Sequence, residues 1–109
     1  MSSYARISCD NAKALIDKQD VNIVDIRDLA SFNHGHIVNA EHLDNHALPD
    51  FINDTDHDTP LVVCCYHGNM SQSAGAYLAE QGFVEVYSLD GGFTQWTSQF
   101  PADCEKEPG

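Results

Sequence analysis

Hydrophobic residues along this chain fall into short unbroken runs, and these runs alternate with stretches that have a helical repeat. The clearest run, residues 61–65, reads Leu-Val-Val-Cys-Cys. A short apolar run without polar alternation is typical of a strand buried on both faces in a parallel sheet. After a glycine-containing loop, residues 71–81 place Ala74, Tyr77 and Leu78 on one helical face, and Gly82 follows as a helix-ending residue. The pattern therefore predicts a strand, a loop and a helix, in that order.

The rest of the chain repeats this alternation. Strands are expected at residues 4–7, 21–26 and 84–89, with an edge strand within 37–43. Helices are expected after the N-cap Ser8, over residues 29–33, around 48–52 and over 93–100, where Phe93, Trp96 and Phe100 share a face. Residues 101–109 are expected to be an acidic, frayed tail.

Strands that alternate with helices predict a three-layer α/β fold. We expect a mostly parallel sheet of about four to five strands with helices on both faces. The length allows one domain over residues 1–109, with a core over about residues 5–100.

Acidic residues dominate the surface charge. The formal net charge is −12 at pH 7. The five basic residues are Arg6, Lys13, Lys18, Arg27 and Lys106. A chain without a basic side chain between Asp28 and Glu105 is not expected to bind nucleic acid or an anionic membrane. No apolar stretch approaches the ~20 residues of a membrane span and the N-terminus lacks a secretory pattern, so we expect a cytoplasmic protein.

The four cysteines differ in what their positions predict. Cys64 and Cys65 are adjacent, whereas Cys9 and Cys104 lie near opposite ends, which is not the spacing of a disulfide framework or a C-x-x-C motif. Cys65 ends the predicted strand and faces the N-terminus of the next helix, where backbone N–H groups and the helix dipole lower a thiol pKa. Cys65 is therefore the candidate nucleophile. Cys64 should point to the other sheet face and pack in the core. Cys9 and Cys104 are expected to be passive, with Cys104 an exposed thiol open to oxidation.

The loop after Cys65 is the candidate site for binding an anion at the sulfur. Its residues are Tyr66, His67, Gly68, Asn69, Met70 and Ser71. Their backbone N–H groups are expected to surround the sulfur as an anion-binding nest, and Gly68 allows the tight curl. His67 either lowers the Cys65 pKa or lies on the rim; a role in proton transfer is disfavoured, because an attacking thiolate needs no base. Tyr66 and Met70 are expected to shape the pocket wall.

Asp25 and Arg27 flank the end of a neighbouring strand, and we expect them to form a structural salt bridge or hydrogen-bond clamp that holds loops together. Arg27 as an anion ligand is the alternative. The sequence His34-Gly35-His36 raises the question of a metal, but no cysteine or acidic partner stands at ligand spacing, so no metal site is expected.

Four segments resemble, in order, the signatures of the rhodanese family. They are Val24-Asp25-Ile26-Arg27, residues 32–40, Cys65-Tyr66-His67-Gly68-Asn69, and Asp90-Gly91-Gly92-Phe93 with Trp96. The resemblance spans about residues 7–100 and implies a rhodanese-like domain. Asn39 stands where the family often has glycine, and asparagine tolerates the left-handed conformation. The loop after Cys65 lacks the arginine or lysine that many thiosulfate-using members carry.

This resemblance implies a sulfurtransferase that works by double displacement and needs no cofactor. Cys65 would take sulfur from a small anionic donor such as thiosulfate, hold it as a persulfide, and pass it to cyanide or to a protein dithiol such as thioredoxin. A cysteine-dependent phosphatase or arsenate reductase is one alternative, but such a site needs an arginine six residues after the cysteine, where this chain has Ser71. A non-catalytic rhodanese-like module is the other alternative, and it normally lacks the cysteine.

Overall fold

Five strands form one sheet at the centre of the structure, a computed structural model that describes residues 3–107. Their order across the sheet is β1 (Ala5–Ile7), β6 (Val86–Leu89), β5 (Leu61–Cys64), β2 (Asn22–Asp25) and β4 (Glu41–His42). Every neighbouring pair runs parallel. All four residues of β5 are buried, as expected for a central strand covered on both faces. The predicted parallel α/β sheet is confirmed.

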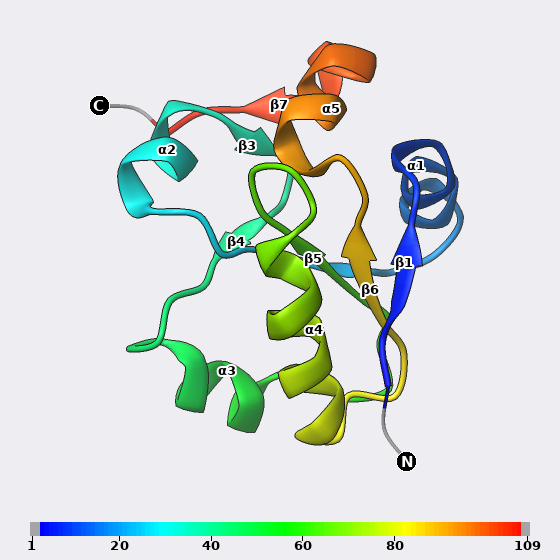
Figure 1. Ribbon diagram of the computed structural model, residues 1–109, viewed down its shortest axis with the longest axis vertical. Coiled ribbons are helices and arrows are strands. Elements are labelled where there is room, and N and C mark those ends of the chain that lie inside the picture. The colour runs from blue at the N-terminus through cyan, green and yellow to red at the C-terminus, as the bar shows by residue number, and fades with distance from the viewer. Residues whose placement is uncertain (1–2, 108–109) are drawn as a thin grey trace.

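Helices cover both faces of this sheet (Figure 1). On one face lie α3 (Leu48–Asp54) and α4 (Met70–Glu80), and on the other lie α1 (Cys9–Lys18) and α5 (Gly92–Gln99). A short helix, α2 (Leu29–His34), follows β2. The predicted three-layer arrangement is therefore confirmed. None of these helices, within residues 3–107, is long and apolar enough to cross a membrane.

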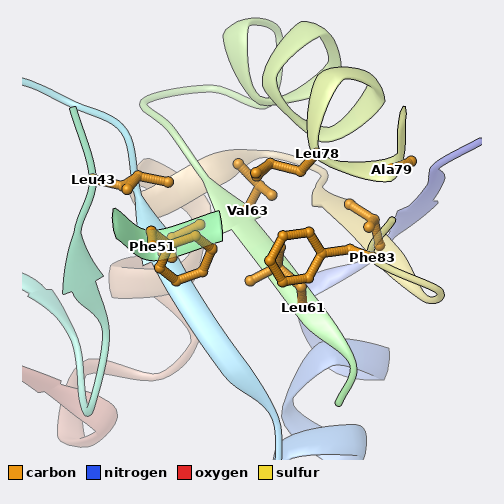
Figure 2. Close-up of a cluster of buried hydrophobic side chains, with 9 residues drawn as sticks. Leu43, Phe51, Leu61, Val63, Leu78, Ala79 and Phe83 are labelled. Atoms are coloured by element: carbon orange, nitrogen blue, oxygen red, sulfur yellow. The ribbon is translucent and has the colours of Figure 1, made fainter. Parts of the chain in front are cut away.

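Alternate residues of β5 belong to two different cores. Leu61 and Val63 pack with Phe51 of α3 and Leu78 of α4, as Figure 2 shows. Val62 and Cys64 belong to the opposite cluster, with residues of α1 and α5. This alternation follows from the period of two along a strand. Cys64 is consequently a core residue, and Cys65 begins the loop on the α4 side.

Local signals in the sequence place most helix ends correctly. The Ser8 side chain caps α1 by accepting a hydrogen bond from the backbone N–H of Asn11 (3.1 Å). Gly82 follows α4 with a φ of +109°. Asn39 has a φ of +70°, the left-handed conformation that was expected of an asparagine there. The side chain of Tyr77 differs from the expectation: it is 44 % exposed rather than part of the core face of α4.

The end of the chain corrects another expectation. Instead of fraying, Pro101–Asp103 forms the 3₁₀ helix η1, and β7 (Cys104–Glu105) pairs antiparallel with β3 (His36–Ile37). Backbone hydrogen bonds from Val38 N–H to the Asp103 carbonyl and from Glu107 N–H to the Asn33 carbonyl, both 3.0 Å, hold this segment. These backbone hydrogen bonds order the segment in spite of its acidic composition. Residues 108–109 of the expected tail lie outside the described residues.

Candidate active site

The Cys65 sulfur lies at the carboxyl-terminal edge of the sheet, directly after β5 and before α4. The residue is only 1 % exposed, and the loop that follows curls around its sulfur. The backbone N–H groups of Gly68 and Ser71 donate hydrogen bonds to Sγ, at 3.2 and 3.3 Å. The Ser71 hydroxyl lies 3.3 Å from the same sulfur. The thiol donates to this hydroxyl, and once the thiol is ionised the hydroxyl can reverse and donate to the thiolate.

These donors decide the charge state of the sulfur. Burial by itself would raise the Cys65 pKa, but hydrogen bonds from the Ser71 hydroxyl and from the N–H groups of Ser71, Gly68 and His67 together lower it below its ordinary value. Burial raises the pKa of the Cys9, Cys64 and Cys104 thiols, most strongly for Cys64. The site therefore favours an anionic sulfur at Cys65 over the other three positions.

A buried serine that the sequence analysis missed supports this arrangement. The hydroxyls of Ser71 and Ser88 lie 2.7 Å apart, and both residues are completely buried. If Ser71 donates to the thiolate, it accepts from Ser88, so the two hydroxyls form a short chain of donors that ends at the sulfur. Ser88 lies on β6, beside Val63 of β5. Its one sequence signal is a hydroxyl in an otherwise apolar strand.

The N-terminus of α5 holds the loop from outside. Phe93 N–H donates to the Cys65 carbonyl (2.8 Å), and Thr94 N–H donates to the Tyr66 carbonyl (3.2 Å). Because these carbonyls are bound to α5, the following N–H groups are free to turn toward the sulfur. The contact requires glycine at position 92, where a Cβ would lie 2.5 Å from the Cys65 and Tyr66 carbonyl oxygens and φ is +58°. Figure 1 shows the loop between β5 and α4 reaching up to α5.

Gly68 is the second glycine that the site requires. Its φ is +92°, and a Cβ there would approach the Gly91 nitrogen to 2.9 Å. The predicted need for a curl at this position is therefore met by a backbone conformation and a close approach that only glycine accommodates well.

Asp25 and Arg27 form the buried clamp that the sequence analysis favoured. The Arg27 guanidinium donates to both carboxylate oxygens of Asp25, at 2.7–3.1 Å, and to the Gly35 carbonyl at 2.6 Å. It also lies over the Phe93 ring, 4.4 Å from the centroid. Through these contacts of Nε, Nη2 and the guanidinium face, Arg27 holds β2, α2 and α5 together at the edge of the sheet where Cys65 lies.

The remaining loop residues form the rim. His67, Asn69 and Met70 are exposed, and Met70 is 59 % exposed. The Tyr66 hydroxyl hydrogen-bonds to Asp28 and lies 3.0 Å from the Ser31 hydroxyl, which ties the loop to the start of α2. The rim position of His67 agrees with one of the two roles considered for it.

The other candidate ligands lie apart from this site. His36 is buried and stacks on Phe32, with ring centroids 3.9 Å apart, and its Nε2 lies 3.3 Å from a Glu105 carboxylate oxygen. Among residues 3–107, no group of three or more histidine, cysteine or acidic side chains is arranged to hold a metal ion. Cys104, expected to be exposed, is half-buried, and its thiol lies 3.5 Å from the Phe100 carbonyl oxygen.

Such a site can hold an anionic sulfur and, one bond further out, a second sulfur with negative charge. Hydrogen-bond donors fixed before the reaction stabilise charge without reorganising, and burial strengthens the effect. The arrangement is suited to nucleophilic attack by a thiolate, and within residues 3–107 the hydrogen-bond partners of Sγ include no guanidinium that could clamp a phosphoryl or arsenate group.

Comparisons with known proteins agree with this geometry. Thiosulfate sulfurtransferase GlpE of Stutzerimonas stutzeri (strain A1501) is 55 % identical over 107 residues, covering 98 % of this chain and 97 % of that protein. The protein of the same name from Ectopseudomonas mendocina (strain ymp) is 58 % identical over 94 % of each chain. The crystal structure of a rhodanese-like domain protein from Staphylococcus aureus superimposes with a TM-score of 0.79 at 25 % identity, covering 95 % of this chain and 99 % of that one. The model of the rhodanese-like domain matches residues 8–99, and the chain belongs to the rhodanese family.

Proposed function

We propose that this protein is a thiosulfate sulfurtransferase whose nucleophile is Cys65. The observation that carries the proposal is the set of donors from Gly68 and Ser71 around a buried sulfur whose pKa is lowered. A thiolate in a preformed anion nest is what attack on a sulfur–sulfur bond requires. The names of relatives more than 50 % identical over nearly the whole chain support the same activity.

The reaction proceeds by double displacement. The Cys65 thiolate attacks the outer sulfur of thiosulfate, the sulfur–sulfur bond of the donor breaks, and sulfite leaves with the electron pair. Cys65 then carries a persulfide, whose terminal charge the loop N–H groups stabilise. A nucleophile next attacks the outer sulfur and releases the Cys65 thiolate. In each step the attacking nucleophile donates an electron pair to the outer sulfur and the leaving sulfur departs with the pair of the broken bond, so no cofactor is required.

Cyanide serves as the acceptor in an assay, and a protein dithiol such as thioredoxin serves in the cell. The cytoplasm is the proposed location, because the four cysteines are all unpaired in the described structure. In this scheme Tyr66, His67, Asn69 and Met70 form the entrance, and Asp25 and Arg27 keep the surrounding loops in place. Phosphatase or arsenate reductase activity is not proposed, since Ser71 stands in the place where the arginine would be needed.

The test is the mass of the intact protein after incubation with thiosulfate. Wild type should gain one sulfur atom and lose it again on addition of cyanide. Cys65→Ser should not gain sulfur, whereas Cys64→Ser should gain it and retain most of the activity. A folded Cys64→Ser variant that cannot be loaded, beside a Cys65→Ser variant that can, would contradict the assignment.

A further inference from the structure

An apolar groove opens beside the candidate active site, on the face of the sheet that carries α3 and α4. Its volume is about 790 Å³, and most of its walls are apolar. The apolar side chains include Ile26, Leu29, Leu43, Leu48, Met70 and Tyr77. Met70, where the loop around Cys65 leads into α4, is also part of the groove wall, so the groove adjoins the entrance to the sulfur.

Exposed apolar side chains gather at this groove. Four large hydrophobic residues are exposed among residues 3–107: Leu29 (55 %), Met70 (59 %), Tyr77 (44 %) and Val84 (71 %). The first three line the groove, and Val84 does not. Single exposed apolar residues need no explanation, but a contiguous group on a soluble domain marks an interaction surface.

The charges around the groove are negative. Asp28 and Asp44 lie on its wall, and the one lysine or arginine there, Arg27, is bound to the Asp25 carboxylate. Arg6 lies on β1, at the edge of the sheet opposite β4, and Lys13 and Lys18 lie on α1, on the other face. Lys106 lines a separate pocket next to α2. A ligand that fills the groove therefore gains from apolar groups and from positive charge around them.

We propose that this groove docks a protein sulfur acceptor through the segment around its reactive thiol, a segment that is apolar beside the thiol and basic beyond it. The inference rests on the proposed function, because it assigns the acceptor for the same Cys65. A small anion gains nothing from apolar walls flanked by aspartates. A sulfur within a residue that is 1 % exposed is best reached by a thiol on a protruding segment, which the groove can hold beside the loop.

The docked thiol takes the sulfur in one displacement. Its thiolate attacks the outer sulfur of the Cys65 persulfide, the bond between that sulfur and Cys65 Sγ breaks, and Sγ leaves as the thiolate that the loop stabilises. The acceptor then carries the persulfide, and no oxidant or reductant is consumed.

The test uses synthetic peptides with a single cysteine as acceptors. The reference peptide has leucines on both sides of the cysteine and lysines beyond them; matched peptides carry serines for the leucines or glutamates for the lysines. The protein variants are Leu29→Ser combined with Tyr77→Ser, and Val84→Ser as the control at an exposed apolar residue outside the groove. Thiosulfate–cyanide turnover is measured in parallel.

We expect the double variant to lose roughly tenfold or more in kcat/KM for the reference peptide, because both substitutions remove apolar surface that the bound peptide would bury. Its cyanide turnover should match wild type, and Val84→Ser should match wild type in both assays. The reference peptide should exceed both matched peptides with wild type. Equal peptide rates for the double variant and the control, or no preference among the peptides, would overturn the proposal.

A binding measurement separates this proposal from the chemistry. Fluorescence anisotropy of the reference peptide with serine in place of cysteine reports docking alone. Groove-dependent binding without any sulfur transfer would refute the proposed function and support the surface. Turnover with cyanide without groove-dependent binding would refute the surface only. Sedimentation is measured as well. If wild type forms concentration-dependent dimers and the double variant does not, the groove binds a second copy of this chain, and the proposal of an acceptor-docking groove is overturned.

Discussion

Replacing Ser71 with alanine tests whether the loop sets the charge of the Cys65 sulfur. The Ser71 hydroxyl, 3.3 Å from Sγ, is one of the four groups that lower the Cys65 pKa, and the variant keeps the other three, the backbone N–H groups of Ser71, Gly68 and His67. A hydrogen bond to a charged group contributes about 1.5–3 kcal/mol. Because three backbone donors remain to stabilise the thiolate, the lower figure applies. That figure corresponds to roughly a tenfold smaller thiolate population at a pH below the thiol pKa.

The direction of the effect follows from the sign of the perturbation. Removing a donor destabilises the thiolate, so the Cys65 pKa rises and the pH profile of reactivity moves to higher pH. The assay is the rate of iodoacetamide alkylation over a pH series, with peptide mapping to separate Cys65 from the other three cysteines. Rates at mildly acidic pH should fall about tenfold relative to the alkaline plateau.

Two controls make the result specific. Ser73→Ala changes an exposed serine of the same helix and should leave the profile unchanged. Ser88→Ala removes the second hydroxyl of the chain and should shift the profile in the same direction, but less. A Ser71→Ala profile that superimposes on wild type, or that moves to lower pH, would refute the role assigned to the loop.

Three further predictions concern stability and charge. Gly92→Ala forces a Cβ to within 2.5 Å of carbonyl oxygens and should cost about 1–3 kcal/mol in urea unfolding, whereas Gly75→Ala, whose nearest contact is 3.5 Å, should be neutral or stabilising. Asp25→Ala leaves the buried Arg27 guanidinium without its carboxylate and should lower the free energy of unfolding by about 3–5 kcal/mol. Arg6→Ala breaks an exposed ion pair and should lower it by less than about 1 kcal/mol, so similar losses for the two variants would contradict the clamp. With a net charge of −12, kcat/KM for thiosulfate should stay flat or rise with added salt, and Met70→Arg should lower KM more than it changes kcat; a steep fall with salt in wild type would contradict this.

The sequence predicted those parts of the site that depend on local structure. Cys65, its loop and the need for Gly68 follow from one strand, one turn and one helix that are adjacent in the chain. Ser88 could not be found in this way, since its hydroxyl reaches Ser71 only through the register of β6 beside β5. The contact between Gly92 and the loop is equally non-local, although Gly91 and Gly92 belong to one of the segments that resemble the family signatures.

The structure differs from the sequence-based predictions at the end of the chain and at Tyr77, and both differences also arise from non-local contacts. Strands β3 and β7 have two residues each, too few for a hydrophobic period, so their pairing could not be read from the pattern. The spacing of Tyr77 is that of a core residue, but its side chain lies on the groove wall and stays 44 % exposed. Periodicity shows which face a residue occupies; it does not show how far the covering elements extend.

The bonds from Phe93 and Thr94 to the loop carbonyls also bear on the order of events during synthesis. Cys65 emerges early in the second half of the chain, whereas the helix that shapes its loop begins at Gly92. Contacts of this sequence separation form only after the intervening chain has closed into place. A nascent chain that ends before α5 lacks these two bonds, so the Cys65 and Tyr66 carbonyls are not yet held and the loop that donates to Sγ is less constrained. The loop around Cys65 is therefore held in its final shape only once α5 has formed.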